Sequence, residues 1–503
     1  MGFWPTSGTL RAGDLEVIGG ALIQSLVTNL DGAGVAVLQP EAGESAATNW
    51  QVNPTVLGQQ NEVFTYSASG GSTNQFPNTL GGSSSHAGAV AKNFHALAPG
   101  SLRLDNCEAS YFYSSIVSQL ATNFNNPLAN QSFTFGNVSA SAQQTIDWNY
   151  DNYASQYNTL FISAANNGGT VSPPATSYNG LAVGAYNGSS SVGPTIDNGR
   201  AKPDLTAPGS STSYSTPLVT GAAALLRQAA VRGDGGDTNA AADLRVTKAL
   251  LLNGAIKPAG WTNQFPSPLD KRYGAGVVNV FNSYRQLTAG KKNPSAMFFT
   301  ATNSAHGVAG SANPINALSG WDYNTNSSVA GSNGVSHYFF NVTNGIAEAT
   351  FTATATLVWN RHLRKTGINN LDLYLYEADS GACVAVSASL VDNVEHLYLP
   401  RLMPGRYDLQ VVKNGGTMIS ATEPYALAFE FFSMPLKVAP SANGLVLTWP
   451  VYPTGFTLQM ATNLVPPLVW TPLTNVTVLV TNNENCAVVS PTEGTQIFRL
   501  SRQ

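Results

Sequence analysis

Over the first 290 residues, short apolar runs typical of buried strands alternate with longer runs of helical periodicity. The clearest apolar runs are 34–38, 160–165 and 181–185. Helical patterns follow at 216–229, with a proline in the first turn, and at 240–255. Strands that alternate with helices predict an α/β fold, in which a parallel sheet carries helices on its faces.

After residue 290 the pattern changes to strands with a period of two. Glycine and proline turns separate these strands without a helical run, which predicts a β-sandwich or jelly roll. The segments with this pattern are 337–342, 349–359, 371–376 and 406–412. A break near 433–435 precedes a short all-β segment. We therefore expect three domains, each with its own core: 1–290, 291–434 and 435–503.

Composition excludes several classes of protein. Hydrophobic residues make up 43% of the 503 residues, which is enough for buried cores and excludes a disordered chain. The 24 Lys and Arg residues are spread thinly and the net charge is −4, so we expect no nucleic-acid partner. No run of about 18 apolar residues predicts a membrane span. Only 10% of residues are charged, which indicates an exported protein, although residues 1–4 do not resemble a signal peptide.

The three cysteines, Cys107, Cys383 and Cys486, lie far apart in the sequence. This spacing predicts neither a metal-ligand cluster nor a disulfide framework. One pair could form a disulfide, but the odd number leaves at least one free thiol. We interpret the cysteines as small buried hydrophobic residues.

Three residues are candidates for chemistry by their local setting. His86 lies among small residues that suit a helix start packed against a sheet. Ser213 precedes the helical run at 216–229, where unpaired backbone N–H groups can stabilise an oxyanion. Asn166 ends an apolar run and could donate its amide N–H to the same oxyanion. Taken singly, the residues are more simply interpreted as a surface or core histidine, a helix-cap serine and a turn asparagine.

Taken together, these segments resemble the subtilisin-like serine proteases, or subtilases. Seven blocks occur in the order of that family over about residues 30–290. The matching segments are 86–91 (HAGAVA), 96–100 (ALAPG), 163–168 (SAANNG), 181–185 (LAVGA), 202–209 (KPDLTAPG), 212–221 (TSYSTPLVTG) and 273–279 (YGAGVVN). Ala87 and Gly88 depart from the usual Gly-Thr after the histidine. The resemblance implies a subtilisin-like parallel sheet with helices on both faces.

The resemblance also implies the roles of the candidate residues. Ser213 would be the nucleophile, His86 its general base, and Asn166 an oxyanion donor together with the Ser213 backbone N–H. The segment that resembles the strand along the substrate cleft is 130–136, but it contains two extra residues. It therefore does not identify the specificity pocket.

The third member of the triad departs from the family pattern. The family has an aspartate after its first long strand, whereas residues 35–43 read VAVLQPEAG and contain none. Counting from the strand places Gln39 at this position, and counting back from the glycine places Glu41 there. We favour Glu41, because a carboxylate can stabilise the imidazolium and a neutral amide cannot. Pro40 has no N–H to donate, so we expect the strand to break there and the carboxylate to turn toward His86.

The later domains resemble modules that follow the protease in many secreted bacterial subtilases. Residues 369–375 (NNLDLYL) and the turn at 404–407 (PGRY) carry this resemblance. The last 70 residues resemble a small β-unit of secreted proteins from Verrucomicrobia-like bacteria. A structural calcium ion is possible, with Asp372, Asp379 and Asp392 as candidate ligands, although solvated carboxylates at strand edges are the simpler interpretation.

The resulting hypothesis is a secreted serine endopeptidase with two β-rich accessory domains. Its partner would be a protein or peptide substrate, and neither a cofactor nor a metal would enter the chemistry. The alternative is a catalytically inactive subtilase scaffold that binds protein or polysaccharide. The missing aspartate and the altered histidine block support this alternative.

Overall fold

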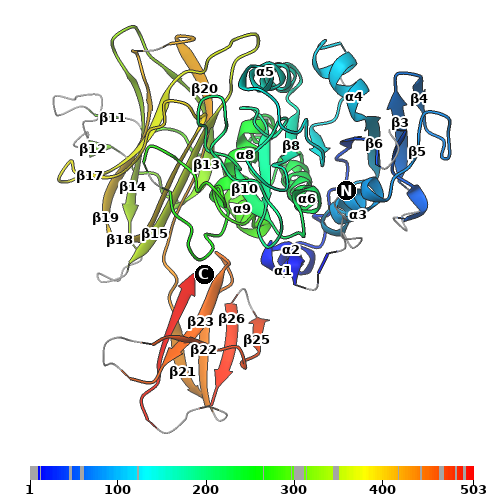
Figure 1. Cartoon of the computed structure of the whole chain (residues 1–503). Coiled ribbons are helices and arrows are strands. Elements are labelled where there is room, and N and C mark those ends of the chain that lie inside the picture. Colours follow the sequence, from blue (N-terminus) through cyan, green and yellow to red (C-terminus); the bar gives the residue numbers. More distant parts are fainter. Residues whose placement is uncertain are drawn as a thin grey trace.

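The first part of the chain is built on an eight-stranded sheet with the order β10-β9-β8-β7-β1-β6-β3-β4 (Figure 1). The computed structural model describes residues 10–11, 13–44, 48–56, 62–121, 124–263, 265–295, 297–298, 311–312, 314–343, 350–416, 418–441, 444–463, 469–481, 484–490 and 494–502. Every neighbouring pair in the sheet is parallel except β3 and β4. Its strands are β1 (Val37–Glu41), β3 (Val63–Ala68), β4 (Gly71–Thr73), β6 (Arg103–Glu108), β7 (Leu128–Gln131), β8 (Leu160–Ala164), β9 (Leu181–Ala185) and β10 (Leu205–Ala207). The predicted parallel sheet is therefore confirmed.

Helices lie on both faces of this sheet. Figure 1 shows α3, α6 and α9 on one side and α5 on the other. The helices of at least nine residues are α3 (Ser85–Leu97), α5 (Ala140–Tyr157), α6 (Thr212–Arg232), α8 (Leu244–Asn253) and α9 (Val280–Thr288). The helix expected at 240–255 is divided, because Asp243 accepts the Arg245 N–H and begins α8 after the short α7 (Thr238–Ala241).

The remaining elements before the sandwich are short. They are α1 (Asp14–Val17), α2 (Gly20–Leu26), α4 (Ala109–Tyr111), a 3₁₀ turn (Pro54–Val56), a π-helical turn (Phe112–Val117), and the two-stranded sheets β2 (Asn49–Gln51) with β5 (Gly82–Ser83) and β11 (Met297–Phe298) with β12 (Ser311–Ala312). Among the described residues, none of the helices combines the length and the apolar character needed to cross a bilayer.

A β-sandwich follows, as the period-two pattern predicts. One sheet has the order β13-β20-β15-β18 and the other β14-β19-β16-β17. All neighbouring strands are antiparallel. The strands are β13 (Ser319–Ser327), β14 (Gly334–Val342), β15 (Phe351–Trp359), β16 (Leu371–Glu377), β17 (Cys383–Ser387), β18 (Val394–Leu402), β19 (Gly405–Lys413) and β20 (Thr422–Phe432). Alternate apolar side chains from both sheets form a core between them.

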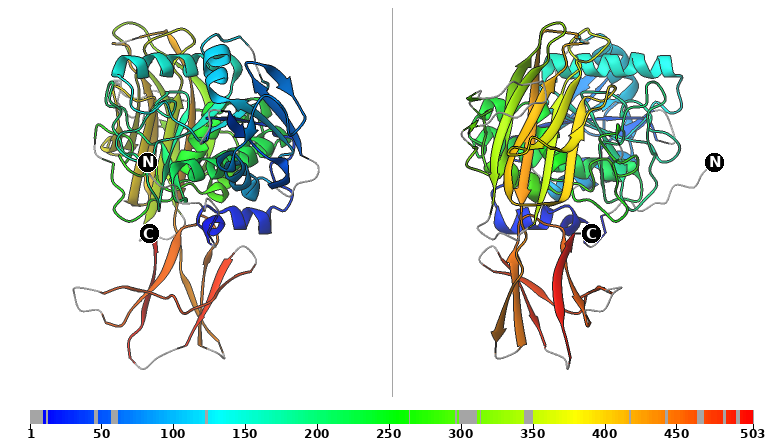
Figure 2. Two further views of the ribbon diagram at one scale, coloured as in Figure 1. Left: turned by 45° about the vertical axis from the view of Figure 1, so that its right-hand side comes forward. Right: turned by 90° about the vertical axis from the view of Figure 1, so that its left-hand side faces the viewer.

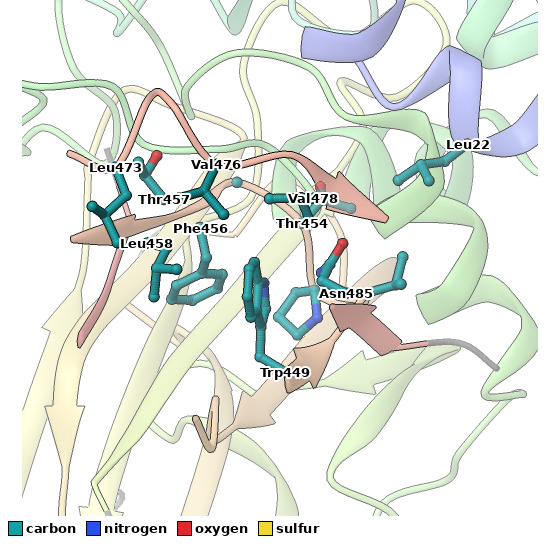
Figure 3. Close-up of a pocket in the computed structure, with 13 residues that line it drawn as sticks. Leu22, Trp449, Thr454, Phe456, Thr457, Leu458, Leu473, Val476, Val478 and Asn485 are labelled. Atoms are coloured by element: carbon teal, nitrogen blue, oxygen red, sulfur yellow. The ribbon is translucent and has the colours of Figure 1, made fainter. Parts of the chain in front are cut away.

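The last part of the chain is a small β-unit that projects from the rest of the molecule (Figure 2, orange to red). Its two sheets have the orders β21-β22-β26-β25 and β24-β23-β27. The strands are β21 (Lys437–Ser441), β22 (Gly444–Pro450), β23 (Phe456–Ala461), β24 (Thr471–Pro472), β25 (Val478–Thr481), β26 (Glu484–Val489) and β27 (Ile497–Arg502). A cavity of about 310 Å³ opens where this unit meets α2, between Trp449, Phe456 and Leu22 (Figure 3). None of the catalytic candidates lines it.

The sandwich shares a hydrophobic core with the first part of the chain. Helix α8 packs against β15 and β20. Trp321, Val358 and Ala428 of the sandwich belong to the same buried cluster as the helices and the parallel sheet. Trp321 is 0% exposed, and its Nε1 donates to the Leu287 carbonyl at 3.0 Å. The sandwich thus has a core of its own between its two sheets, and in addition it shares a buried face with α8. The exact domain boundaries remain a prediction.

A chain ending at Leu287 should therefore fail to fold cooperatively. Each large apolar side chain whose burial is lost costs roughly 1.5–3 kcal/mol, so a few such losses remove much of a typical stability of about 5–15 kcal/mol. The test compares solubility and thermal unfolding with those of a chain ending at Ser433. That control keeps all of the shared core except Val451 and should unfold cooperatively. A Leu287 chain that melts at the full-length temperature would contradict the prediction.

All three cysteines are free thiols. Cys107 is buried, Cys486 is partly exposed and Cys383 is exposed. The interpretation of the cysteines as buried small residues is therefore correct for Cys107 alone. No two of the three cysteines form a disulfide, which the sequence had allowed for one pair.

Candidate active site

In each of two helices the second residue is a catalytic candidate. Helix α3 begins at Ser85, and the Oγ of its N-cap, Ser84, accepts a backbone N–H of the first turn at 3.0 Å. His86 is therefore the second residue of the helix. Helix α6 begins at Thr212, so Ser213 lies within its first turn. The expectation that the helix begins after Ser213 is wrong, because the proline at its sixth position does not mark the start.

Close packing of α3 and α6 brings the two helix starts together. A Cβ atom added to Gly221 of α6 would lie 3.0 Å from the Leu97 Cβ of α3, which is too close for most side chains. Near the start of α6, Asn93 Nδ2 of α3 donates to the Tyr214 carbonyl at 3.2 Å. The centroids of the His86 and Tyr214 rings are 6.0 Å apart. His86 thus lies beside the residue that follows Ser213.

The structure brings Glu41 to the imidazole of His86. Glu41 Oε2 lies 3.1 Å from His86 Nδ1. The Glu41 side chain is 1% exposed, whereas that of His86 is 19% exposed and reaches solvent. An imidazole that donates Nδ1–H to a carboxylate keeps the Nε2 lone pair available as a base.

Gln39 contacts the same carboxylate from its other side. Gln39 Nε2 donates to Glu41 Oε1 at 2.9 Å and to the Ala87 carbonyl of α3 at 3.0 Å. Both residues lie on β1, two positions apart, so their side chains point to the same face of the sheet. The strand break that we expected at Pro40 does not occur. Strand β1 continues to Glu41 in register with β6, while its pairing with β7 ends at Leu38.

The carboxylates near His86 favour its protonated form. Burial by itself disfavours the imidazolium and lowers the pKa of His86. The charge of Glu41, its hydrogen bond and the charge of Glu44 act in the opposite direction, and the pKa of His86 is raised above its ordinary value. A raised pKa makes His86 a stronger base for removing a proton from a hydroxyl.

The Ser213 hydroxyl is held by the segment that follows β7. Ser213 Oγ donates to the Ser132 carbonyl at 3.3 Å, and Ser132 Oγ donates to the Ser213 carbonyl at 2.9 Å. Ser213 is 5% exposed. Among the described contacts, its hydroxyl makes no hydrogen bond to His86. In unliganded hydrolases the bond between nucleophile and base is often long and tightens when substrate binds.

Asn166 follows β8 and adopts a left-handed backbone conformation with a φ of 95°. Its Nδ2 donates to Ser172 Oγ at 3.1 Å, and its main-chain carbonyl accepts the Ser191 N–H at 2.7 Å. An amide Nδ2 carries two N–H bonds, so this contact leaves one of them for a ligand.

The neighbours of Asn166 and Ser213 join the two segments. Asn167 Oδ1 accepts the Thr212 N–H at 2.9 Å and the Thr212 Oγ1–H at 2.8 Å. The Ser213 N–H, in the first turn of α6, donates to no protein acceptor among the described residues. The amide of Asn166 and this backbone N–H therefore lie on two segments that are hydrogen-bonded to each other.

The KPD segment forms a buried ion cluster with α8. Asp204 is fully buried, and its carboxylate lies 2.6 Å from Lys202 Nζ and 3.3 Å from Lys248 Nζ. Burial raises the pKa of Asp204, but the two ammonium groups outweigh burial and lower it. This block of the family pattern thus ties β10 to α8.

The candidate calcium ligands each have protein partners. Asp392 accepts the Ala201 N–H at 2.7 Å, and Asp379 pairs with Arg406 at 2.7 Å. Burial raises the pKa of Asp372 to about 6. No group of three or more acidic, histidine or cysteine side chains suited to a metal occurs in the part of the chain that the structure describes.

Sequence reasoning missed three contributors to the site: Gln39 as a partner of Glu41, Ser132 as a partner of Ser213, and Glu44, which contacts the start of α3. Ser132 lies in segment 130–136, which resembles the strand along the substrate cleft. This resemblance could have identified Ser132 as a contributor to the site. No local signal marks Glu44, because its partner His86 is 42 positions away.

Comparisons with known proteins match part of the chain to one sequence family and find solved structures of low sequence identity. Residues 81–276 match the sequence model of the Subtilase family, a range that includes His86, Asn166 and Ser213 and begins after Glu41. No curated protein matches the chain. Fervidolysin from Fervidobacterium pennivorans, a keratinolytic enzyme related to subtilisin, is 13% identical over 82% of this chain and 76% of its own, with a TM-score of 0.38. Tripeptidyl peptidase 2 is 12% identical over 78% of this chain and 48% of its own, with a TM-score of 0.32.

Proposed function

We propose that this chain, which contains a subtilase domain over residues 81–276, is a secreted serine endopeptidase. The observation that carries the proposal is the buried contact of Glu41 Oε2 with His86 Nδ1 at 3.1 Å. A carboxylate in this place orients the imidazole, and it stabilises the imidazolium that forms when His86 accepts a proton. The small fraction of charged residues supports secretion.

Acylation would begin at Ser213. Its Oγ attacks the carbonyl carbon of the peptide bond while His86 Nε2 takes the hydroxyl proton. For this step the hydroxyl must turn from the Ser132 carbonyl toward the imidazole. The negative charge that develops on the substrate oxygen accepts hydrogen bonds from Asn166 Nδ2 and the Ser213 N–H.

The tetrahedral intermediate then collapses. Its C–N bond breaks, and the imidazolium of His86 gives its proton to the departing amine. A water molecule hydrolyses the acyl-enzyme on Ser213 by the same route in reverse order. The reaction needs no cofactor, and no step of this proposal uses a metal ion.

The second candidate function is an inactive subtilase scaffold that binds protein or polysaccharide. One observation favours it: the Ser213 hydroxyl donates to a main-chain carbonyl and not to His86. A scaffold would need neither the base nor the acid, whereas Glu41 and Gln39 form a connected network that ends on the imidazole. We therefore favour the peptidase.

Labelling with a fluorophosphonate distinguishes the two functions. The probe phosphonylates a serine only when a base activates its hydroxyl, so we expect one adduct, located on Ser213 by mass spectrometry. Ser213→Ala should remove the adduct, and His86→Ala should strongly reduce it. A folded protein that forms no adduct at Ser213 would favour the scaffold.

A further inference from the structure

A second carboxylate lies at the start of α3. Glu44 Oε2 accepts the His86 backbone N–H at 3.1 Å and the Ser84 hydroxyl at 2.8 Å. Its Oε1 accepts the Ser85 hydroxyl at 2.7 Å. Three consecutive residues that end at His86 are therefore bound to one side chain.

This position suits a carboxylate for two reasons. The first N–H groups of a helix have no partner within the helix, and Glu44 supplies an acceptor to one of them. Negative charge is also favoured at this end of the helix dipole. Glu44 therefore restrains the backbone of the residue whose ring Glu41 contacts from the strand.

We propose that Glu44 is a positioning residue for His86. Glu44 fixes the start of α3 and supplies a second negative charge to the imidazolium of His86. The inference deepens the proposed peptidase function and rests on it for its catalytic meaning. Glu41 acts on the His86 ring through Nδ1, and Glu44 acts on the backbone N–H of His86. Neither contact substitutes for the other.

The charges around His86 are consistent with this role. Glu41 faces it from β1, Glu44 from the segment after β1, and Tyr214 from α6. The negative charge of Glu44 is among the causes that raise the pKa of His86. Burial raises the pKa of Tyr214, and the charges of Glu44 and then Glu41 add to this effect, so Tyr214 stays neutral while His86 titrates.

The test is Glu44→Gln, which keeps the size of the side chain and removes its charge. Loss of a negative charge disfavours the imidazolium, so the pKa of His86 should fall by about 0.2–0.7 unit. The acid limb of the kcat/KM profile should move to lower pH by the same amount, while kcat at high pH changes little. NMR titration of the His86 ring, assigned by the loss of its signal in His86→Ala, measures the pKa without activity.

Two further variants complete the experiment. Glu44→Asp keeps the charge and should recover much of the wild-type pKa of His86. Glu377→Gln is the matched control, because Glu377 in the sandwich also accepts a hydroxyl and backbone N–H groups, here from Ser380 and Asp379. It should leave the titration of His86 unchanged.

The outcomes separate this inference from the proposed function. A His86 pKa that is the same in folded Glu44→Gln and in the wild type would overturn the inference, even if the protein is an active peptidase. An equal loss of kcat at every pH with no shift of the acid limb would show a purely structural role and would also overturn it. A wild-type protein without peptidase activity would refute the proposed function, and the NMR titration would still decide the role of Glu44.

Discussion

Replacement of Ser213 by alanine should abolish peptidase activity, with a fall in kcat of about 10³-fold or more. In the proposed mechanism the substitution removes the oxygen that attacks the substrate. Stability should change little, because the hydroxyl makes one long hydrogen bond, at 3.3 Å to the Ser132 carbonyl. Such a bond contributes only about 0.5–1.5 kcal/mol, so the melting temperature should stay within a few degrees of the wild type.

The matched control for this variant is Ser215→Ala. Ser215 lies in the same turn of α6, is buried, and donates its hydroxyl to the Ser211 carbonyl at 3.2 Å. The Ser215→Ala variant should lose as much stability as Ser213→Ala but should keep its peptidase activity. The measurements are kcat on a peptide substrate and thermal unfolding of all three proteins. Retained activity of Ser213→Ala in a preparation free of other peptidases would disprove the assignment of the nucleophile.

The second large effect is expected at Glu41. Glu41→Gln keeps the shape of the side chain and should lower kcat by roughly 10⁴-fold, as loss of the triad acid does elsewhere. The contacts of Gln39 explain why. Gln39 presents an N–H to the Oε1 position, so the new amide would direct its oxygen there and its NH₂ group toward His86 Nδ1. Nδ1 would then have to accept, which leaves the proton on Nε2, where the base is needed.

Two variants isolate this effect from general damage to the sheet. Gln39→Ala removes one hydrogen bond from Glu41 but keeps its charge on His86, so it should cost much less activity. Glu108→Gln changes a carboxylate at the position that pairs with Glu41 on the neighbouring strand, where it caps α4. It should be nearly as active as the wild type. If Gln39→Ala loses more activity than Glu41→Gln, the amide and not the carboxylate is the important group.

Much of the fold and three of the candidate site residues could be predicted from short segments. The apolar runs at 160–165 and 181–185 became β8 and β9, because strands buried on both faces read as continuous apolar runs. Asn166 and Ser213 stand at a strand end and in a first helical turn, where their local setting already suggests their chemistry. The roles of these residues remain predictions, although the structure joins their segments through Asn167.

Local reasoning was less accurate where helices begin and strands end. Pro217 suggested a helix start several residues too late, because this proline lies inside α6, at its sixth position. The Ser213 carbonyl, which the missing N–H of Pro217 leaves without its helical partner, accepts the Ser132 hydroxyl instead. Pro40 suggested the end of a strand, yet β1 passes through it. Its missing N–H is tolerated there because the ladder with β7 has already ended at Leu38.

The sequence by itself determined the parallel sheet, the sandwich and the segments that hold His86, Asn166 and Ser213, because these depend on neighbours within a few positions of the chain. Only the tertiary structure shows which of Gln39 and Glu41 contacts the His86 ring, since both side chains point to the same face of β1 and contact with His86 depends on where α3 lies. It also decided that α8 is covered by the sandwich. Periodicity shows that a helix face is apolar, but which distant strands bury it is set by packing between segments far apart in the chain.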